Sequence, residues 1–303
     1  MKPKVFIAVA DENWICDRLS QEWKDNFHTV DNPHDADIIW ILSPYVWRIL
    51  PISLLKSKTV CLTVHHITPW KFTREKLREF LIRDSYINFY HVPCNKTKEA
   101  VKKITKKDVF VQPFWVNNNI WFSLTKPEAR SALDLPNDEY LIGSFQRDTE
   151  GGDLKSPKLE KGPDIFCDIV ESISGKNDNL AIVLAGLRRQ YVIERLKKAG
   201  IKYYYYEQTD FQTLNKLYNS LDLYIVSSRC EGGPQAIVEA AATKTPIIST
   251  DVGLATYFLS SESIYDPSGA LGKPNVKHAY SRVKEHLLPT GFEPFVQFFE
   301  SVV

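Results

Sequence analysis

Residues 221–250 read LDLYIVSSRCEGGPQAIVEAAATKTPIIST, and this stretch decides the fold of the second half of the chain. The apolar run Leu221–Val226 predicts a buried parallel strand. The Ala-rich stretch Gln235–Thr243 predicts a short helix, and Thr245–Thr250 predicts the next strand. A strand, a tight turn, a helix and a second strand, in this order, form the repeating unit of a parallel α/β sheet.

The turn between this strand and helix places two carboxylates around the start of the helix. Gly232 and Gly233 allow a sharp turn and close approach of the backbone to a ligand, and Pro234 suits the first helical position. Glu231 precedes the turn, whereas Glu239 lies five residues into the helix, about 7.5 Å along its axis. The helix N-terminus between them attracts anions, most simply phosphate. Two acids flanking a phosphate site predict a nucleotide sugar as the ligand.

The string from Glu231 to Glu239, followed by TPIISTDVG at 245–253, resembles the E-x7-E region of retaining GT-B glycosyltransferases, family 4 in particular. The resemblance implies that Glu239 binds the ribose hydroxyls of the donor and that Glu231 is a catalytic residue in contact with the donor sugar. It also implies that the turn and the helix start bind the nucleotide sugar through Gly232, Gly233, Pro234 and Gln235. The implied fold is α/β, with two Rossmann-like parallel-sheet domains facing a central cleft.

The composition is that of a globular protein with reduced cysteines. The 303 residues are 44% hydrophobic and 25% charged, with a formal net charge of +1, so no overall field favours nucleic acid. The five cysteines are scattered and none forms a CxxC pair, which predicts free thiols and a cytoplasmic location. The sequence shows neither a signal peptide nor a run of 18 apolar residues, so we expect no transmembrane segment.

Residues 1–118 alternate predicted strands and helices. The strands are expected at Val5–Ala10, Asp37–Leu42, Thr59–Val64, Ile87–Val92 and Val109–Val111, and the helices at Glu12–Phe27, Thr73–Arg83 and Asn95–Ile104. This alternation predicts a parallel sheet with helices on both faces, and the resemblance implies that 1–118 is the acceptor-side domain. In the helix 73–83 we expect Leu77, Phe80 and Leu81 to lie inside.

The end of the strand Thr59–Val64 places His65 at the edge of the sheet where ligands bind. VCLTVH at 60–65 resembles the family strand that ends in a cleft histidine, which implies a catalytic His65 in contact with sugar or acceptor. A purely structural histidine is the alternative. The chain has no GxGxxG after its first strand and no GxxxxGK[ST], which argues against a dinucleotide dehydrogenase and a P-loop NTPase. No metal site and no cofactor are expected.

A Pro- and Asn-rich passage at 111–122 resembles the family linker and predicts a domain boundary. We expect the nucleotide-sugar-binding domain at 119–289. The last stretch, 290–303, predicts an amphipathic helix with three phenylalanines on one side, and the resemblance implies that it packs back onto the first domain.

After the predicted strand Tyr140–Phe145, the chain carries two candidate cations for the diphosphate. GSFQR at 143–147 resembles the family's G-x-x-G-R, with Gln146 in place of the second glycine, and this implies a role for Arg147. The family then has a Lys before a Gly, which Lys161 fits across a polar insertion at 148–160 that we expect to be mobile. Both cations would neutralise the leaving group. Two other lysines compete for this place: Lys155 and Lys158.

The strand Ala181–Ala185 ends at Gly186, which the resemblance implies to lie against the nucleotide. Arg188 and Arg189 follow directly. Two interpretations stay open for these arginines: they reach the nucleotide, or they are exposed residues at the start of a helix.

Charge is concentrated in part of the first domain. Residues 56–107 hold 13 Lys or Arg but only 4 Asp or Glu. Two interpretations of this basic cluster are open. The lysines and arginines lie on solvated helix faces, or they form a surface that binds an anionic membrane or an anionic acceptor. We therefore expect peripheral membrane contact through residues 71–107 as one of two alternatives.

The resemblance and the residues together predict a retaining, metal-independent, hexosyltransferase-like glycosyltransferase with a nucleotide diphosphate sugar as donor and a glycan, lipid or small molecule as acceptor. Two alternatives share the donor site. One is a GT-B sugar-nucleotide epimerase or hydrolase, and the other is a protein that binds nucleotide sugars without turnover.

Overall fold

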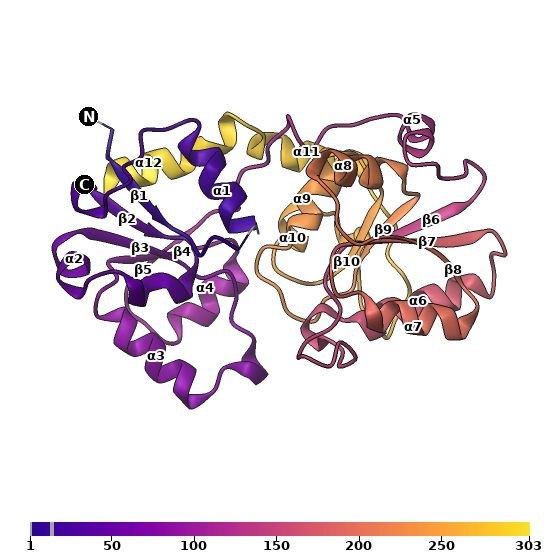
Figure 1. Cartoon of the computed structure of the whole chain (residues 1–303), viewed down its shortest axis with the longest axis horizontal. Helices are drawn as coiled ribbons and strands as arrows, with labels where there is room; N and C mark the ends of the chain where they lie inside the picture. The colour runs from indigo at the N-terminus through magenta and orange to yellow at the C-terminus, as the bar shows by residue number, and fades with distance from the viewer. Residues whose placement is uncertain (1, 13–14) are drawn as a thin grey trace. The chain divides into compact units, whose positions relative to one another are not determined.

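The structure is a computed structural model that describes residues 2–12 and 15–303. The chain forms two compact units, which are described separately (Figure 1). Unit 1 comprises Met1–Phe114 and Pro289–Val303, and unit 2 comprises Trp115–Leu288. Each unit contains a parallel sheet with helices packed on it, so the predicted α/β class with two Rossmann-like units is confirmed.

The strands of unit 1 pair in sequence order, and each pair is parallel. They are β1 (Val5–Ala8), β2 (Ile38–Ile41), β3 (Thr59–Thr63), β4 (Phe89–Val92) and β5 (Asp108–Val111). The helices are α1 (Ile15–Lys24), α2 (Ile52–Ser57), α3 (Arg74–Asp84), α4 (Asn95–Lys102) and α12 (Glu293–Ser301). Thr29 also bridges Val5 in parallel, so the chain returns to one side of β1 before it forms β2 on the other. The winding of this sheet therefore reverses at β1.

Helices cover both faces of the unit 1 sheet, as the alternation predicts. On one face Ile39 and Ile41 of β2 pack in a core with residues of α2, α3 and α4. On the other face the ring of Trp40 lies 5.6 Å from Phe295 and 5.2 Å from Phe299 of α12. Figure 1 shows α12 beside α1 in this unit. Edge and tilted ring contacts of this kind add to the free energy gained from burying the aromatic area.

Helix α3 departs from the prediction on one side. Phe80 is buried and stacks on Tyr90 with ring centroids 5.3 Å apart, as expected. Leu77 and Leu81, which we expected inside, are 37% and 50% exposed, so that part of the prediction is wrong. The reason is that α3 is buried only along a narrow stripe formed by Phe80 and Arg83 in its C-terminal half.

The sheet of unit 2 has the order β11-β10-β9-β6-β7-β8, again with parallel pairs. Its strands are β6 (Tyr140–Ser144), β7 (Leu180–Ala185), β8 (Lys202–Tyr206), β9 (Leu223–Val226), β10 (Ile247–Thr250) and β11 (Ile264–Tyr265). The chain builds β7 and β8 on one side of β6 and then places β9 on the other. The winding reverses between β6 and β9, and in open α/β sheets ligands bind beyond the strand ends at such a point.

The helices of unit 2 are α5 (Lys126–Ser131), α6 (Pro163–Ser174), α7 (Gln190–Ala199), α8 (Phe211–Ser220), α9 (Gln235–Ala242), α10 (Ala255–Phe258) and α11 (Val276–Val283). The central strands β7 and β9 are buried along their whole length, which explains their unbroken apolar sequences. Among the described residues of the whole chain, no helix combines the length and the apolar character needed to cross a bilayer.

Candidate functional site

The loops after β6 and β9 bring together Lys161 and Glu231, two of the residues singled out from the sequence. The Lys161 ammonium nitrogen lies 2.7 Å from Glu231 Oε2, with side chains 23% and 8% exposed. The Ser228 hydroxyl donates to the other carboxylate oxygen, Oε1, at 2.7 Å. Both oxygens of Glu231 are thus held, and a charged hydrogen bond in a largely buried place is stronger than one in water.

Gln146, the residue that departs from the family pattern, connects these two loops. Its amide nitrogen donates to the carbonyl of Lys161 at 2.9 Å. Its amide oxygen lies 3.2 Å from the Ser228 hydroxyl, which also serves Glu231. A glycine at this position would offer neither bond, so the substitution gives the site a side-chain tie between β6 and β9.

A glycine fixes the place of Lys161. The short 3-10 turn Leu159–Lys161 ends at Gly162, whose φ of 60° is left-handed. A Cβ on Gly162 would lie 1.9 Å from the backbone oxygen of Ser227. No side chain fits there, so the turn packs directly on the chain after β9. This close approach fixes the backbone position of Lys161 relative to the chain after β9.

Glu239 lies on α9 and is 7% exposed. Its Oε2 accepts a hydrogen bond of 3.0 Å from the hydroxyl of Tyr218. Burial, followed by the neighbouring Tyr224 and the Glu239 carboxylate, raises the pKa of Tyr218, so this tyrosine remains a donor at neutral pH. The carboxylate is therefore oriented by a side chain of α8.

The turn before α9 is packed closely against the loop after β10. Gly253 has a φ of 43°, and a Cβ there would lie 2.1 Å from the backbone oxygen of Gly232. Pro234 directly precedes α9, whose first residue is Gln235. The Gln235 amide donates to Gly233 at 3.4 Å, while its buried amide oxygen has no hydrogen-bond partner among the described residues. The predicted nucleotide-binding turn thus holds an unused acceptor.

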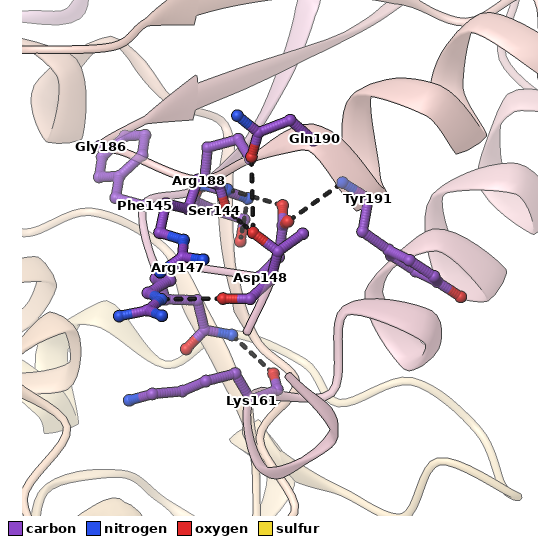
Figure 2. A network of polar contacts seen from close by, with 12 residues as sticks. Ser144, Phe145, Arg147, Asp148, Lys161, Gly186, Arg188, Gln190 and Tyr191 are labelled. Carbon is purple, nitrogen blue, oxygen red and sulfur yellow. Dashed lines mark hydrogen bonds and ion pairs between the residues drawn. The ribbon is translucent and has the colours of Figure 1, made fainter. Parts of the chain in front are cut away.

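Arg147 and Lys161 extend toward the same side of the polar network (Figure 2). Arg147 is half-buried, and its Nε donates to the carbonyl of Thr149 at 2.8 Å. Burial and then the nearby charge of Arg188 lower the pKa of Arg147. Gly186, at the end of β7, has a φ of 88° and is held by Tyr205, which donates to its carbonyl at 3.1 Å.

Arg189 takes neither of the two roles considered from the sequence. It is fully buried, and its Nε lies 2.9 Å from Asp148 Oδ2. Its other nitrogens donate to the carbonyls of Ser144 and Ala185, the latter at 3.0 Å, and to the Ser144 hydroxyl at 3.2 Å. Asp148 also accepts from the Tyr191 amide at 3.3 Å (Figure 2). Arg189 is a buried structural residue that ties the ends of β6 and β7 to α7.

The insertion at 148–160 is a hairpin at its base, whereas we expected a mobile loop. Thr149 bridges Pro157 in antiparallel fashion. The Glu150 amide donates to Ser156 at 3.0 Å, and the Lys158 amide donates to Asp148 at 2.8 Å. Because Asp148 is buried with Arg189, the base of the hairpin is anchored to the sheet.

His65 lies in unit 1, while the other predicted site residues lie in unit 2. Its Nε2 donates to the carbonyl of Leu42 at 2.9 Å and lies 3.5 Å from the sulfur of Cys16. Its ring stacks on Phe114 at 6.0 Å. Burial lowers the pKa of His65, so the imidazole is neutral at pH 7. Across residues 2–12 and 15–303, no three His, Cys, Asp or Glu side chains gather as metal ligands.

Comparison with known proteins adds a family match and a set of similar structures. Residues 155–288 match the family model described as "Glycosyl transferases group 1". The lipopolysaccharide core biosynthesis mannosyltransferase LpsB of Rhizobium meliloti (strain 1021) is 27% identical over 135 residues, which is 42% of this chain and 36% of the relative. The match thus spans about a third of that protein.

Solved structures are similar over nearly the whole chain. HepE (Alr3699) of Anabaena, in complex with UDP-glucose, aligns with a TM-score of 0.74 and 12% identity over 99% of this chain and all of that one. A glycosyltransferase from Rickettsia africae ESF-5 gives a TM-score of 0.63 and 14% identity, over 98% and 89% of the two chains. Sucrose-phosphate synthase of Thermosynechococcus elongatus gives 0.61 and 14%, over 97% and 76%. At these identities the likeness shows the fold, which is GT-B.

Proposed function

We propose that this chain, whose residues 155–288 match the group 1 glycosyl transferases, is a retaining glycosyltransferase that uses a nucleotide diphosphate sugar. The observation that carries the proposal is the oriented pair of acids around α9, with Glu231 ion-paired to Lys161 and Glu239 bonded to Tyr218. This arrangement lies where the winding of the unit 2 sheet reverses. The solved complex of HepE with UDP-glucose supports such a donor.

In this proposal each residue has one role. Glu239 accepts the ribose hydroxyls, and Glu231 contacts the donor sugar. Lys161 and Arg147 hold the diphosphate and offset the negative charge that grows on it as the sugar leaves, so the reaction requires no metal. His65 contacts the sugar or the acceptor as a neutral hydrogen-bonding group. The donor phosphate then assists deprotonation of the acceptor, which gives retention without a second carboxylate.

A thermal-shift panel of nucleotide sugars, followed by product analysis, tests this function. A ligand present at 100 times its Kd raises the stability of the folded state by about 2.7 kcal/mol. With the stabilising donor identified, sugar transfer to an added glycan or lipid acceptor supports the proposal. Epimerisation or hydrolysis of the donor alone identifies the first alternative, and binding without any turnover identifies the second. No stabilisation by any nucleotide sugar contradicts all of them.

We expect Glu239→Gln to weaken binding of the nucleoside diphosphate at least tenfold. A charged hydrogen bond to a ribose hydroxyl is worth about 1.5–3 kcal/mol, and the amide removes the charge while still accepting from Tyr218. Isothermal titration measures the affinity, and Glu194→Gln, on the exposed face of α7, is the control. Equal affinity of the Glu239 variant and the parent protein would remove Glu239 from the site.

We also propose a cytoplasmic, membrane-peripheral location in which the basic stretch 71–107 of unit 1 faces anionic lipid and the acceptor is a glycan or is lipid-linked. The structure adds exposed apolar side chains to the charges: Trp70 is 56% exposed, and Leu81 and Ile82 of α3 are each 50% exposed. A basic surface with exposed large apolar groups is typical of helices that lie at a bilayer interface.

Four lysines lie near the end of this stretch: Lys102, Lys103, Lys106 and Lys107. Replacing all four with Glu should abolish binding to vesicles that contain phosphatidylglycerol. Each lysine near an anionic surface contributes about 1 kcal/mol, and salt should weaken the parent's binding because the Debye length is about 8 Å at physiological ionic strength. Co-sedimentation measures binding, with phosphatidylcholine vesicles as control. If the variant still co-sediments with the vesicles as the parent does, or if the parent does not co-sediment at all, these lysines belong to an ordinary solvated surface.

A further inference from the structure

Arg188 has a strained backbone that the insertion hairpin holds in place. Its φ of 64° lies in the left-handed region, which residues with a side chain rarely adopt. Its carbonyl accepts from the amide of Asp148 at 3.1 Å and from the hydroxyl of Thr149 at 3.3 Å. Strain that the surrounding structure maintains in this way is concentrated at functional sites.

The guanidinium of Arg188 is incompletely used within the protein. One terminal nitrogen donates to the carbonyl of Gly151, at the start of the hairpin tip. The Nε is buried, yet it has no hydrogen-bond partner among the described residues. A buried donor without an acceptor is unfavourable, and native structures rarely leave one without a reason.

Arg188 also lies near a second cation with the same kind of support. Burial, followed by the charge of Arg188, lowers the pKa of Arg147, and the carboxylates of Glu150 and Glu160 each oppose this shift more weakly. Arg147 is oriented by the carbonyl of Thr149, and Arg188 by that of Gly151. Thus two carbonyls of one hairpin, only two positions apart, orient the side chains of both arginines.

We propose that Arg188 is a binding residue for the diphosphate of the nucleotide donor, and that it forms with Arg147 a two-arginine clamp positioned by the 148–160 hairpin. The proposal rests on the proposed function and adds a residue to its donor site. A diphosphate relieves the repulsion between the two cations and supplies acceptors for the unused N–H groups. The planar guanidinium fork matches phosphate oxygens in a way that a lysine does not.

The contrast with Arg189 supports this assignment. Arg189 is completely buried, and each of its guanidinium nitrogens donates to Asp148, Ser144 or Ala185. Its side chain is 0% exposed, so a ligand cannot reach it. Its neighbour Arg188 is half-buried and has one buried donor without an acceptor. The two adjacent arginines therefore have different roles: Arg189 anchors the structure, and Arg188 binds the ligand.

Four variants of the full chain test the clamp. Arg188→Gly removes the guanidinium and suits the left-handed backbone, so a loss of binding cannot be assigned to strain. Arg188→Lys and Arg188→Gln share the same unfavourable φ and differ in charge. Arg195→Gln is the control, since Arg195 pairs with Asp168 and Glu171 on the helical surface of unit 2. Isothermal titration with UDP, GDP, ADP and inorganic pyrophosphate measures affinity, and thermal unfolding checks the fold.

We expect Arg188→Gly to lose at least about tenfold in affinity for the nucleoside diphosphate that the parent binds, because charged hydrogen bonds are removed. Arg188→Lys should keep more affinity than Arg188→Gln, while Arg195→Gln should match the parent. Affinity of Arg188→Gly within about twofold of the parent, or equal affinities of the Lys and Gln variants, would overturn the clamp and leave the proposed function standing.

Titration with inorganic pyrophosphate distinguishes the arginine clamp from the proposed nucleotide-sugar function. Binding of pyrophosphate that depends on Arg188, without binding of any nucleoside diphosphate, would keep the clamp and contradict the nucleotide-sugar function. Binding of none of the four probes by the parent would overturn both.

Discussion

Lys161→Ala should lower kcat by about 100- to 1,000-fold, the usual effect of removing one group that stabilises developing negative charge. The ammonium lies 2.7 Å from Glu231, so the variant removes both the cation for the leaving diphosphate and the partner of a carboxylate that is 8% exposed. Affinity for the donor should fall much less than kcat, because the charge on the diphosphate grows only as the bond to the sugar breaks.

Lys158→Ala is the matched control for this experiment. Its side chain is 22% exposed against 23% for Lys161, and its ammonium lies 3.9 Å from Glu160 in the same short segment. Initial rates at saturating donor give kcat for both variants, so the effects of two similarly exposed lysines can be compared directly. A loss of kcat in the Lys158 variant with an intact rate in the Lys161 variant would show that the two lysines exchange roles.

Gly162→Ala should unfold unit 2 at a much lower temperature than the parent and should abolish transfer. A Cβ would lie 1.9 Å from the oxygen of Ser227, which is a backbone atom and cannot rotate away. The turn that carries Lys161 would have to move off the chain after β9, and the Lys161–Glu231 pair would separate. The expected loss is several kcal/mol, combining a left-handed Ala at about 1–2 kcal/mol with displaced backbone.

Gly200→Ala isolates the backbone part of that loss. Gly200 has a φ of 68°, close to the 60° of Gly162, but a Cβ there would meet no described atom within 4 Å. The Gly200 variant should therefore lower the melting temperature by a few degrees, since about 1 kcal/mol corresponds to roughly 2–4 °C in a unit of this size. Similar melting temperatures for the two variants would contradict the steric explanation.

Elements defined by local sequence could be predicted, and the strand–turn–helix–strand at β9, α9 and β10 is the clearest example. There the apolar run, the glycine turn and the Ala-rich helix favour the same structure at every level. The role of Lys161 at the end of the insertion stays a prediction, and the close approach of Gly162 to Ser227 leaves no local signal beyond the glycine itself. The two-residue strand β11 and the bridge at Thr29 are too short to leave a periodic pattern.

Contacts between distant segments could not be predicted in this way. Arg189 and Asp148 are 41 positions apart, and nothing in either neighbourhood marks them as a buried pair. Periodicity likewise identified an apolar stripe on α3 but not whether another element covers it, so Leu81 was wrongly placed inside. The unused donor of Arg188 is a property of three-dimensional packing alone.

The reversed winding of the unit 2 sheet also has a consequence for synthesis on the ribosome. β6 pairs with β7 soon after it is made, but its other edge pairs with β9, where Ile142 meets Leu223. During elongation that edge stays open until the later strand emerges, and an open edge can pair with another chain. Glu231 and Glu239 follow β9, so the nascent chain acquires the acids of its candidate site only as this exposed edge closes.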